Sequence, residues 1–383
     1  MSRILFILAT VVAAFAGTTP RATAAPVPAE SPKVDLVLCL DVSNSMDGLI
    51  DSAKLKLWDV VNELAKMKPT PELRVGLYSY GHNGYAPKEG WIRKDLDLTT
   101  DLDEVYGKLT ALKTGGGTEL VARVTKDALT QQKWADTKNA LKLVFVCGNE
   151  PVDQDKEVNL SDVAKMAKDK GVFINAIYCG ADGNGESAGW KDFAFQCQGK
   201  YTSFDQDKAR KSGVVATPFD KQLAELSGKL NTTYVAYGDE GKKKAENQAA
   251  QDKNAVAAAP GAAASRAASK AGDLYRNGSW DLIDKMKDDP KFDLKSIKEE
   301  DLGDELKKLK AEDRLPFLKK KAEDRVAIQK EIGDLSKKRV KHIEAESKKL
   351  TPSAGEKAFD DALRGTIREQ AKAKGLEAPP EKK

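Results

Sequence analysis

Length, charge and histidine content set the first limits on this chain. Its 383 residues exceed the usual size of one domain, about 100 to 200 residues, so we expect two regions of different character. The 63 basic and 59 acidic side chains give a net charge of +4, which leaves no chain-wide field to recruit nucleic acid. Only two histidines, His82 and His342, occur, so a histidine-rich or CxxC zinc site lacks its ligands.

The N-terminus has the pattern of a secretory signal peptide. Arg3 precedes an apolar run at 4–16, and small residues end at Ala24, after which we expect cleavage. The predicted signal peptide is therefore residues 1–24, and the mature protein is expected in the periplasm, the cell envelope or outside the cell. The apolar run is shorter than the roughly 20 residues that span a bilayer, and we expect no transmembrane segment in the mature chain.

Four cysteines in an exported protein permit disulfides, but their positions in predicted strands and helices suit buried thiols equally well. If a bridge forms, the favoured pair is Cys179 with Cys197.

Short apolar runs alternate with amphipathic ones over the first half of the chain, as strands and crossover helices do in a parallel sheet. The pattern predicts an α/β fold with a doubly wound, mostly parallel six-stranded sheet at residues 25–238. A short link rich in glycine between the second and third strands predicts that one edge strand is antiparallel. We expect strands at 34–41, 73–80, 91–98, 141–147, 172–179 and 200–204, and helices at about 48–67, 101–112, 119–132, 159–170, 187–197 and 217–231.

The second half has a different composition. Residues 239–270 are rich in Ala and Lys and poor in large apolar side chains, which argues against a packed core and predicts a linker, partly helical at most. Residues 271–383 predict a charged α-helical extension with one long helix, interrupted at Pro316 and closed by Pro352. Its apolar stripe is thin, so a solvated tail that packs loosely or self-associates is favoured over a stable coiled coil.

Asp41, Ser43 and Ser45 directly follow the first predicted strand, in the segment LCLDVSNSMDG. Ligands of open α/β sheets bind outside the carboxyl ends of the strands, and these hard oxygen donors suit Mg²⁺. The alternative is helix capping, in which the same side chains satisfy the first amides of the next helix.

Thr118 changes this balance, because it follows the glycine run of LKTGGGTEL in a loop predicted to return to the same rim. At this point residues 34–230 resemble the von Willebrand factor A (VWA) domain family. Its metal-ion-dependent adhesion site (MIDAS) joins a DxSxS motif, matched here by Asp41, Ser43 and Ser45, with a threonine matched by Thr118. The resemblance to the family implies these four residues as metal ligands, and the segment CGNEP (147–151) looks like that of exported bacterial members.

One position departs from the family pattern. The family usually ends its fourth strand with an aspartate, where this chain has Gly148 in LVFVCGNEPVDQD. Asn149, Glu150 or Asp153 could supply the missing oxygen from the same loop. With one carboxylate fewer, we expect only weak binding of Mg²⁺, or of Ca²⁺ or Mn²⁺.

The resemblance implies a binding protein rather than an enzyme. The bound ion would capture a carboxylate of a protein partner, and no protein nucleophile is needed. Metal-assisted hydrolysis is the enzymatic alternative, but the rim offers no evident general base except His82, which suits a hydrogen bond within a hairpin better. A further alternative is a metal-free structural scaffold of the cell envelope that acts through its helical tail.

Overall fold

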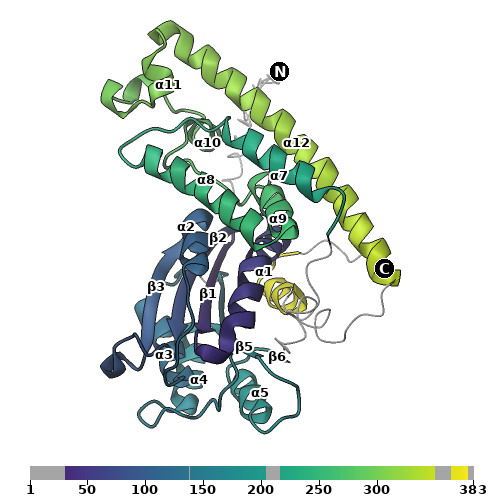
Figure 1. Ribbon diagram of the computed structural model, residues 1–383. Helices are drawn as coiled ribbons and strands as arrows, with labels where there is room; N and C mark the ends of the chain where they lie inside the picture. The colour runs from purple at the N-terminus through teal and green to yellow at the C-terminus, as the bar shows by residue number, and fades with distance from the viewer. Residues whose placement is uncertain (1–30, 138, 204–215, 350–363, 378–383) are drawn as a thin grey trace, which may run out of the picture. The chain divides into compact units, whose positions relative to one another are not determined.

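The chain folds around a six-stranded sheet with the order β3-β2-β1-β4-β5-β6, here described from a computed structural model (Figure 1). The structure describes residues 31–137, 139–203, 216–349 and 364–377, without the side chains of residues 45, 48–49, 51–57 and 347–349. Neighbouring strands are parallel except β3, which is antiparallel to β2. The strands are β1 (Lys33–Asp41), β2 (Glu72–Tyr80), β3 (Ile92–Thr99), β4 (Leu141–Gly148), β5 (Phe173–Tyr178) and β6 (Tyr201–Ser203).

Helices cover both faces of the sheet, as the nearly continuous apolar character of β1 requires. Alternate side chains of β1 enter two cores: Leu36 and Leu40 pack with α1 and α2, whereas Val37 and Cys39 pack with α3, α4 and α5. The helices are α1 (Asp47–Ala65), α2 (Leu102–Thr110), α3 (Val121–Gln131), α4 (Leu160–Lys170) and α5 (Ser187–Gln196). This arrangement confirms the doubly wound prediction.

The sequence located the sheet closely. Each predicted strand ends within one residue of the observed one, and the antiparallel edge strand is confirmed. All four cysteines are buried free thiols, so the bridge between Cys179 and Cys197 is not formed. The predicted signal peptide and Pro352 lie outside the described residues. Among the helices that the structure describes, none is both long and apolar enough to span a membrane.

The segment 239–270 differs from the expected linker, because it forms two packed helices. Nine of the eleven residues of α9 are buried, although most of them are Ala or Ser. These small side chains let α9 lie close against α1, α7 and α8. The helices therefore pack tightly without large apolar side chains. The boundary at residue 238 stays a prediction. The helices are α7 (Asp220–Asn231), α8 (Gly241–Ala258) and α9 (Pro260–Lys270).

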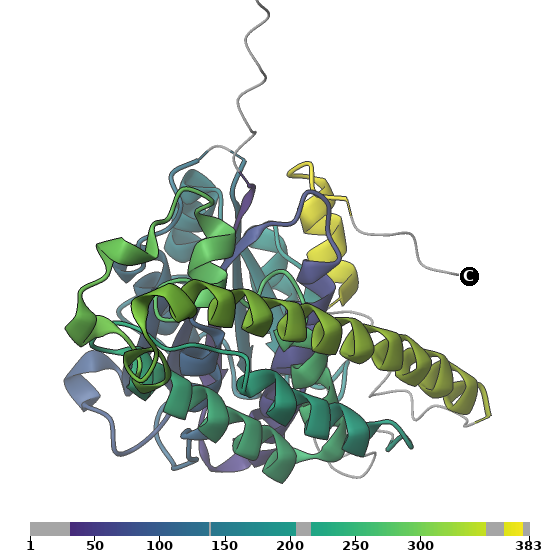
Figure 2. The ribbon, with the colours of Figure 1, turned by 90° about the horizontal axis from the view of Figure 1, so that it is seen from above.

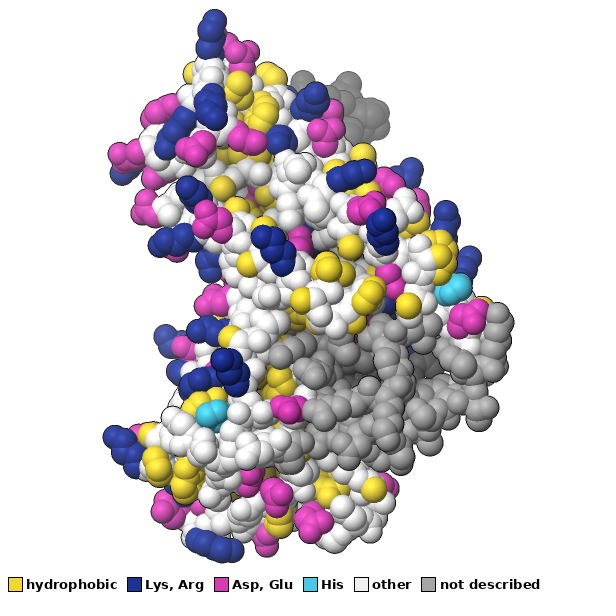
Figure 3. All heavy atoms as spheres, viewed as in Figure 1, with side chains coloured by type: hydrophobic (Ala, Val, Ile, Leu, Met, Phe, Trp, Pro, Cys, Tyr) yellow, Lys and Arg dark blue, Asp and Glu magenta, His cyan; other side chains and the backbone are white. Residues whose placement is uncertain are grey.

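The long helix of the second half is neither interrupted nor wholly solvated. It runs as α12 (Ala311–Lys349) through Pro316, which lies near its start and therefore removes only one early backbone hydrogen bond. Figure 2 shows α12 lying beside α7, and its Ile332 and Leu335 are buried against α7 and α9. Its outer surface carries intermixed acidic and basic side chains (Figure 3). The shorter helices α10 (Leu282–Asp288) and α11 (Asp304–Lys307) form a small core with its first turns.

The last described segment returns to the sheet. Residues 364–372 are helical, and Ile367, Ala371 and Leu376 are buried in the same core as α1. The side-chain amides of Gln370 and Asn175, on β5, exchange two hydrogen bonds of 2.8 and 3.0 Å. Part of the predicted tail is therefore a component of the sheet's own core.

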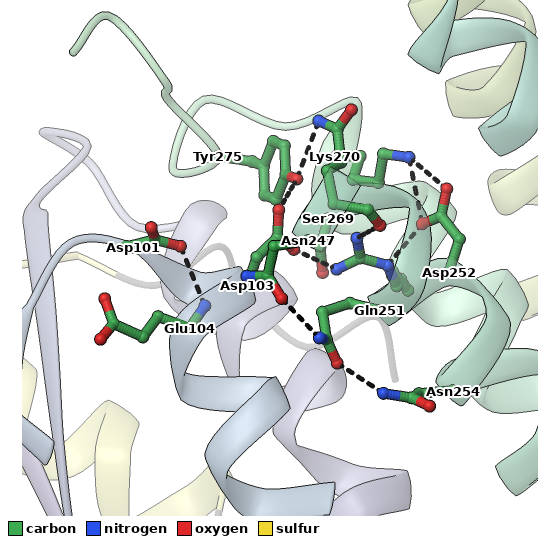
Figure 4. A network of polar contacts seen from close by, with 12 residues as sticks. Asp101, Asp103, Glu104, Asn247, Gln251, Asp252, Asn254, Ser269, Lys270 and Tyr275 are labelled. Atoms are coloured by element: carbon green, nitrogen blue, oxygen red, sulfur yellow. Dashed lines mark hydrogen bonds and ion pairs between the residues drawn. The ribbon is translucent and has the colours of Figure 1, made fainter. Parts of the chain in front are cut away.

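Buried ion pairs join the two halves of the chain. Arg266 of α9 is fully buried, donates to Asp103 of α2 (2.7 Å) and Asp252 of α8 (2.6 Å), and lies over the ring of Trp58 in α1. Lys270, also fully buried, donates to both oxygens of Asp252 (3.1 and 2.9 Å; Figure 4), and burial lowers its pKa to about 8. Breaking such a pair is costly because it leaves an uncompensated buried charge.

Replacement of Arg266 by alanine tests whether these buried ion pairs stabilise the contact between the two halves of the chain. Arg266→Ala leaves Asp103 and Asp252 without the guanidinium, and we expect a loss of about 3 to 5 kcal/mol in unfolding free energy by urea denaturation. Arg276→Ala removes an exposed ion pair with Asp288 and is the matched control, with a loss of at most about 1 kcal/mol. Equal losses for the two variants would contradict a buried joint between the halves.

Candidate metal site

Three chain segments meet at the carboxyl end of β1. The amide of Val42, just after β1, donates to the carbonyl of Tyr80 at the end of β2 (2.8 Å). The carbonyl of Val42 accepts from the amide of Gly115 (2.9 Å), in the loop between α2 and α3. These two backbone hydrogen bonds hold the ends of two strands and a loop together. The rim predicted from the sequence is thereby formed.

The glycine run in the loop permits this close approach. A Cβ atom on Gly115 would lie 2.7 Å from His82 Nε2, and one on Gly117 would lie 2.8 Å from the carbonyl group of Gly81. One on Gly116 would lie 3.0 Å from the side-chain nitrogen of Asn44. Side chains at these three positions would therefore push the loop away from β1 and β2. The run serves close packing.

Asp41 lies at the centre of the rim and is fully buried. Its Oδ1 accepts from the Ser43 amide (2.8 Å), whereas Oδ2 has no hydrogen-bond partner among the described residues. Burial raises the pKa of Asp41 to about 7, hydrogen bonds from Ser43 lower it, and the charges of Glu119 and Glu150 raise it further. A buried carboxylate oxygen with no donor is costly, and it is the atom that a cation would satisfy.

The other three predicted ligands differ in how far the structure describes them. Ser43 is buried, and its Cβ lies 3.6 Å from a Cβ atom built on Gly81, so it shares the rim with Asp41. Ser45 lies in the 3₁₀ turn Asn44–Met46, and its side chain is outside the described set. Thr118 is half-buried. Its two chain neighbours, Gly117 and Glu119, both approach Gly81, which brings Thr118 to the same rim. Ligation by these residues stays a prediction.

Glu119 is a member of the site that the sequence analysis missed. Its Cγ and Asp41 Oδ1 would each lie 3.0 Å from a Cβ atom on Gly81. Burial raises the pKa of Glu119 and nearby Glu150 raises it further, while a hydrogen bond with the Ser43 side chain lowers it. Its position directly after Thr118 was the available signal, since a loop that delivers one residue to the rim also delivers its neighbour.

The space beside Gly148 is filled by aromatic side chains. A Cβ atom there would lie 2.6 Å from Tyr80 Oη, 3.1 Å from the ring of Trp190 and 3.2 Å from Asp41 Oδ2. Tyr80 Oη is itself fixed by donating to the carbonyl of Cys147 (2.8 Å). An aspartate at position 148 would therefore collide with Tyr80, so the packing at this position requires glycine.

Of the three substitutes considered for that acid, Glu150 is the one whose charge raises the pKa of both Asp41 and Glu119. Asp153 is exposed on the same loop, and Asn149 is half-buried.

His82 has the structural role that the sequence favoured. Its Nδ1 accepts from the amide of Gly84 (2.8 Å) within the β2–β3 connection, so Nε2 carries the proton in the neutral ring. Its ring is stacked on Tyr85 with centroids 4.8 Å apart. The hairpin hydrogen bond predicted for His82 is confirmed.

The donor set fits a weakly held hard cation. Its groups are oxygens: the buried Asp41 carboxylate, the Ser43 hydroxyl, Thr118 and the half-buried Glu119. Within the described parts of the chain, no cluster of three or more His, Cys, Asp or Glu side chains is placed to hold a metal ion. A cation here would therefore depend on hydroxyl groups and water as well as on Asp41, which suits Mg²⁺ better than a soft metal.

Comparison with known proteins identifies the family of the domain that contains the sheet. The model of the von Willebrand factor type A domain matches residues 35–205. This part of the chain is a VWA domain. Such domains generally mediate protein–protein interaction, in some cases through a MIDAS metal site, and most are interaction modules rather than enzymes. The comparison with curated proteins found no match.

Comparison with solved structures gives matches of low identity and low TM-score. The VWA domain of SpRpn10 is 18% identical over 48% of this chain and 100% of that chain, with a TM-score of 0.35. A von Willebrand factor type A protein from Catenulispora acidiphila is 15% identical over 47% of this chain and 41% of that one, with a TM-score of 0.35.

Proximal thread matrix protein 1 from the mussel byssus, solved with a zinc-occupied MIDAS motif, is 13% identical over 47% of this chain, with a TM-score of 0.35. This chain spans 44% of that protein, less than half of its length.

The pKa of Asp41 predicts a pH dependence of stability in the presence of a chelator. Because its folded pKa, about 7, exceeds the unfolded value, its contribution is complete below about pH 4 and is lost as the pH rises through 7. The side chain of Asp41→Asn stays neutral at every pH. We therefore expect the unfolding free energy of this variant, measured with urea, to rise by about 2 to 4 kcal/mol relative to that of wild type when the pH is raised from 5 to 8.5. Asp153→Asn, at an exposed acid, is the control, and parallel pH profiles for Asp41→Asn and wild type would contradict the assignment.

Proposed function

We propose that this chain is an exported binding protein whose VWA domain captures a carboxylate of a protein partner through a weakly bound divalent cation. The observation that carries the proposal is the buried Asp41 Oδ2, which has no hydrogen-bond partner among the described side chains of the rim where Ser43 and the loop of Thr118 converge. Export is supported by the signal-peptide pattern of residues 1–24. The partner is expected to be a protein, because VWA domains generally bind proteins.

Asp41, Ser43, Ser45 and Thr118 are the residues proposed to hold the ion, with Glu119 near enough to assist. When bound, a divalent cation supplies a positive charge and an open coordination position for a carboxylate. Asp41 would balance the charge of the ion, and the buried Ser43 amide fixes the orientation of that carboxylate. Tyr80 and Trp190 exclude a second carboxylate beside Gly148, which limits the charge of the site.

We expect the affinity to be modest. Cation sites tune their affinity by the number and rigidity of charged ligands, and sites of low charge bind with dissociation constants on the order of 10⁻⁴ to 10⁻³ M. Such a site would be filled by Mg²⁺ or Ca²⁺ only at millimolar concentrations. Mg²⁺ is the favoured ion because the donors are few and water can complete its coordination.

A metal-free scaffold is the second candidate, and the burial of Asp41 favours it. A carboxyl group with a pKa near 7 is partly protonated at neutral pH, so the domain tolerates the absence of an ion. In that case the helices that follow the sheet would carry the interaction. The two candidates differ in whether a cation binds at Asp41.

Water-proton relaxation with Mn²⁺ distinguishes them, using residues 25–383. We expect Mn²⁺ to bind the wild-type protein, and the slow tumbling of the bound ion to enhance the relaxation of water protons. A decamer of glutamate is expected to reduce this enhancement, because its carboxylate replaces water bound to the ion. Asp41→Asn is expected to weaken Mn²⁺ binding at least tenfold, whereas Asp169→Asn, at an exposed position on α4, leaves it unchanged. Equal Mn²⁺ binding by wild type and Asp41→Asn would overturn the proposal in favour of the scaffold.

A further inference from the structure

A cleft lies next to the candidate metal site, between the connection from β2 to β3 and the end of α2. Its volume is about 540 Å³, within the range of small ligand sites, and its lining includes Tyr85, Ile92 and Ala111 together with His82, Arg93 and Lys113. No acidic side chain contributes to this lining among the residues described. The cleft therefore combines an apolar floor with groups that donate hydrogen bonds or carry positive charge.

Three of the lining side chains form a fixed stack. The ring of His82 lies on one side of Tyr85, at 4.8 Å between centroids and an interplanar angle of 22°, and the Arg93 guanidinium carbon is 4.5 Å from the Tyr85 centroid. The Tyr85 hydroxyl is 2.9 Å from the hydroxyl of Ser79, which holds the stack on β2. Groups that are already ordered lose little conformational entropy when a ligand binds.

The charges in the cleft are presented to solvent. Lys113 is exposed, and the Arg93 side chain is 48% exposed although it is paired with Asp95. The Asp95 side chain is only 4% exposed, so it orients the guanidinium from below and does not line the cleft. Figure 3 shows basic side chains gathered beside a histidine on this part of the surface.

The cleft is adjacent to the metal site along the chain and in space. His82 follows Gly81, on which a Cβ atom would lie 3.0 Å from Asp41 Oδ1, and its ring packs on Gly115 of the same loop that carries Thr118. The metal site is acidic, since Glu119 Cγ and Asp41 Oδ1 would each lie 3.0 Å from a Cβ atom on Gly81, and Glu150 follows the end of β4. A negative rim that needs a cation thus lies beside a cleft that already carries positive charge.

We propose that this cleft is a second anchor for an acidic segment of the partner protein, binding carboxylates that neighbour the one captured at the metal site. The inference rests on the proposed function and adds the chemistry of the partner: a stretch with several carboxylates rather than a single one. Glu119 and Glu150 repel such a segment until a cation is bound. The cation therefore permits binding, and the cleft favours partner segments that are rich in carboxylates. Lys113 supplies long-range attraction, and the His82–Tyr85–Arg93 stack supplies the shaped wall.

Fluorescence anisotropy with a labelled decamer of glutamate tests the anchor in residues 25–383 at saturating Mg²⁺. We expect Lys113→Glu to weaken binding about tenfold and Lys113→Gln to have an intermediate effect, because the charge at the cleft is reversed or removed. Lys165→Glu, at an exposed position on α4, makes the same charge change elsewhere and is expected to bind like wild type. A decamer of glutamine is expected not to bind.

The outcomes separate this inference from the proposed function. If Lys113→Glu and Lys165→Glu weaken binding equally, the effect is one of net charge and the anchor is refuted, while Mg²⁺-dependent binding of the decamer would still support the metal site. If the decamer binds wild type equally with Mg²⁺ and with chelator, the proposed function fails at the metal. Thermal unfolding of each variant checks that Lys113→Glu and Lys113→Gln are folded, and both lie on the surface, where substitutions change stability little.

Discussion

The burial of one carboxyl group at the end of the central strand is the constraint on which the site depends. Asp41 ends β1, which has a strand on each side and a layer of helices on each face, and its side chain is fully buried. The fold satisfies one of its oxygens with the Ser43 amide, and in the part of the chain that the structure describes the other oxygen has no donor. A group in this position either holds a proton or binds a cation, and both outcomes follow from the same desolvation.

The neighbourhood of Asp41 adapts to a site with few charges. In place of a second carboxylate at Gly148, the hydroxyl of Tyr80 and the ring of Trp190 occupy the space, and a tyrosine hydrogen bond to Cys147 closes it. The glycine run of the opposite loop brings Glu119 to the rim instead. The acids near Asp41 are therefore Glu119 and Glu150, and position 148 has no room for a third. The second half of the chain belongs to the same body, because α1 follows the site directly and is covered by α9 through Trp58 and Arg266.

The strands of the sheet could be predicted from the sequence because the patterns that mark them are local along the chain. Apolar runs identify the strands, and a short link with several glycines identifies the antiparallel edge. The prediction failed for α9, since Ala and Ser give no apolar signal and Arg266 and Lys270 are typical of a solvated helix until their buried partners are known. Those partners lie on α2 and α8 and cannot be found from spacing. The approach of Glu119 to Asp41 and the closure of the space at Gly148 by Tyr80 also arise only when distant segments meet.

An anomalous difference map from crystals of residues 25–383 equilibrated with Mn²⁺ shows directly whether Asp41 binds a cation. We expect one peak at the carboxyl end of β1, near the Ser43 hydroxyl and about 2.0 to 2.6 Å from an oxygen of Asp41, which is the range of hard-cation bonds. We also expect that the peak disappears in Asp41→Asn crystals under the same conditions. A wild-type map with no density at Asp41, with Mn²⁺ ordered elsewhere on the protein, would contradict a cation site at Asp41.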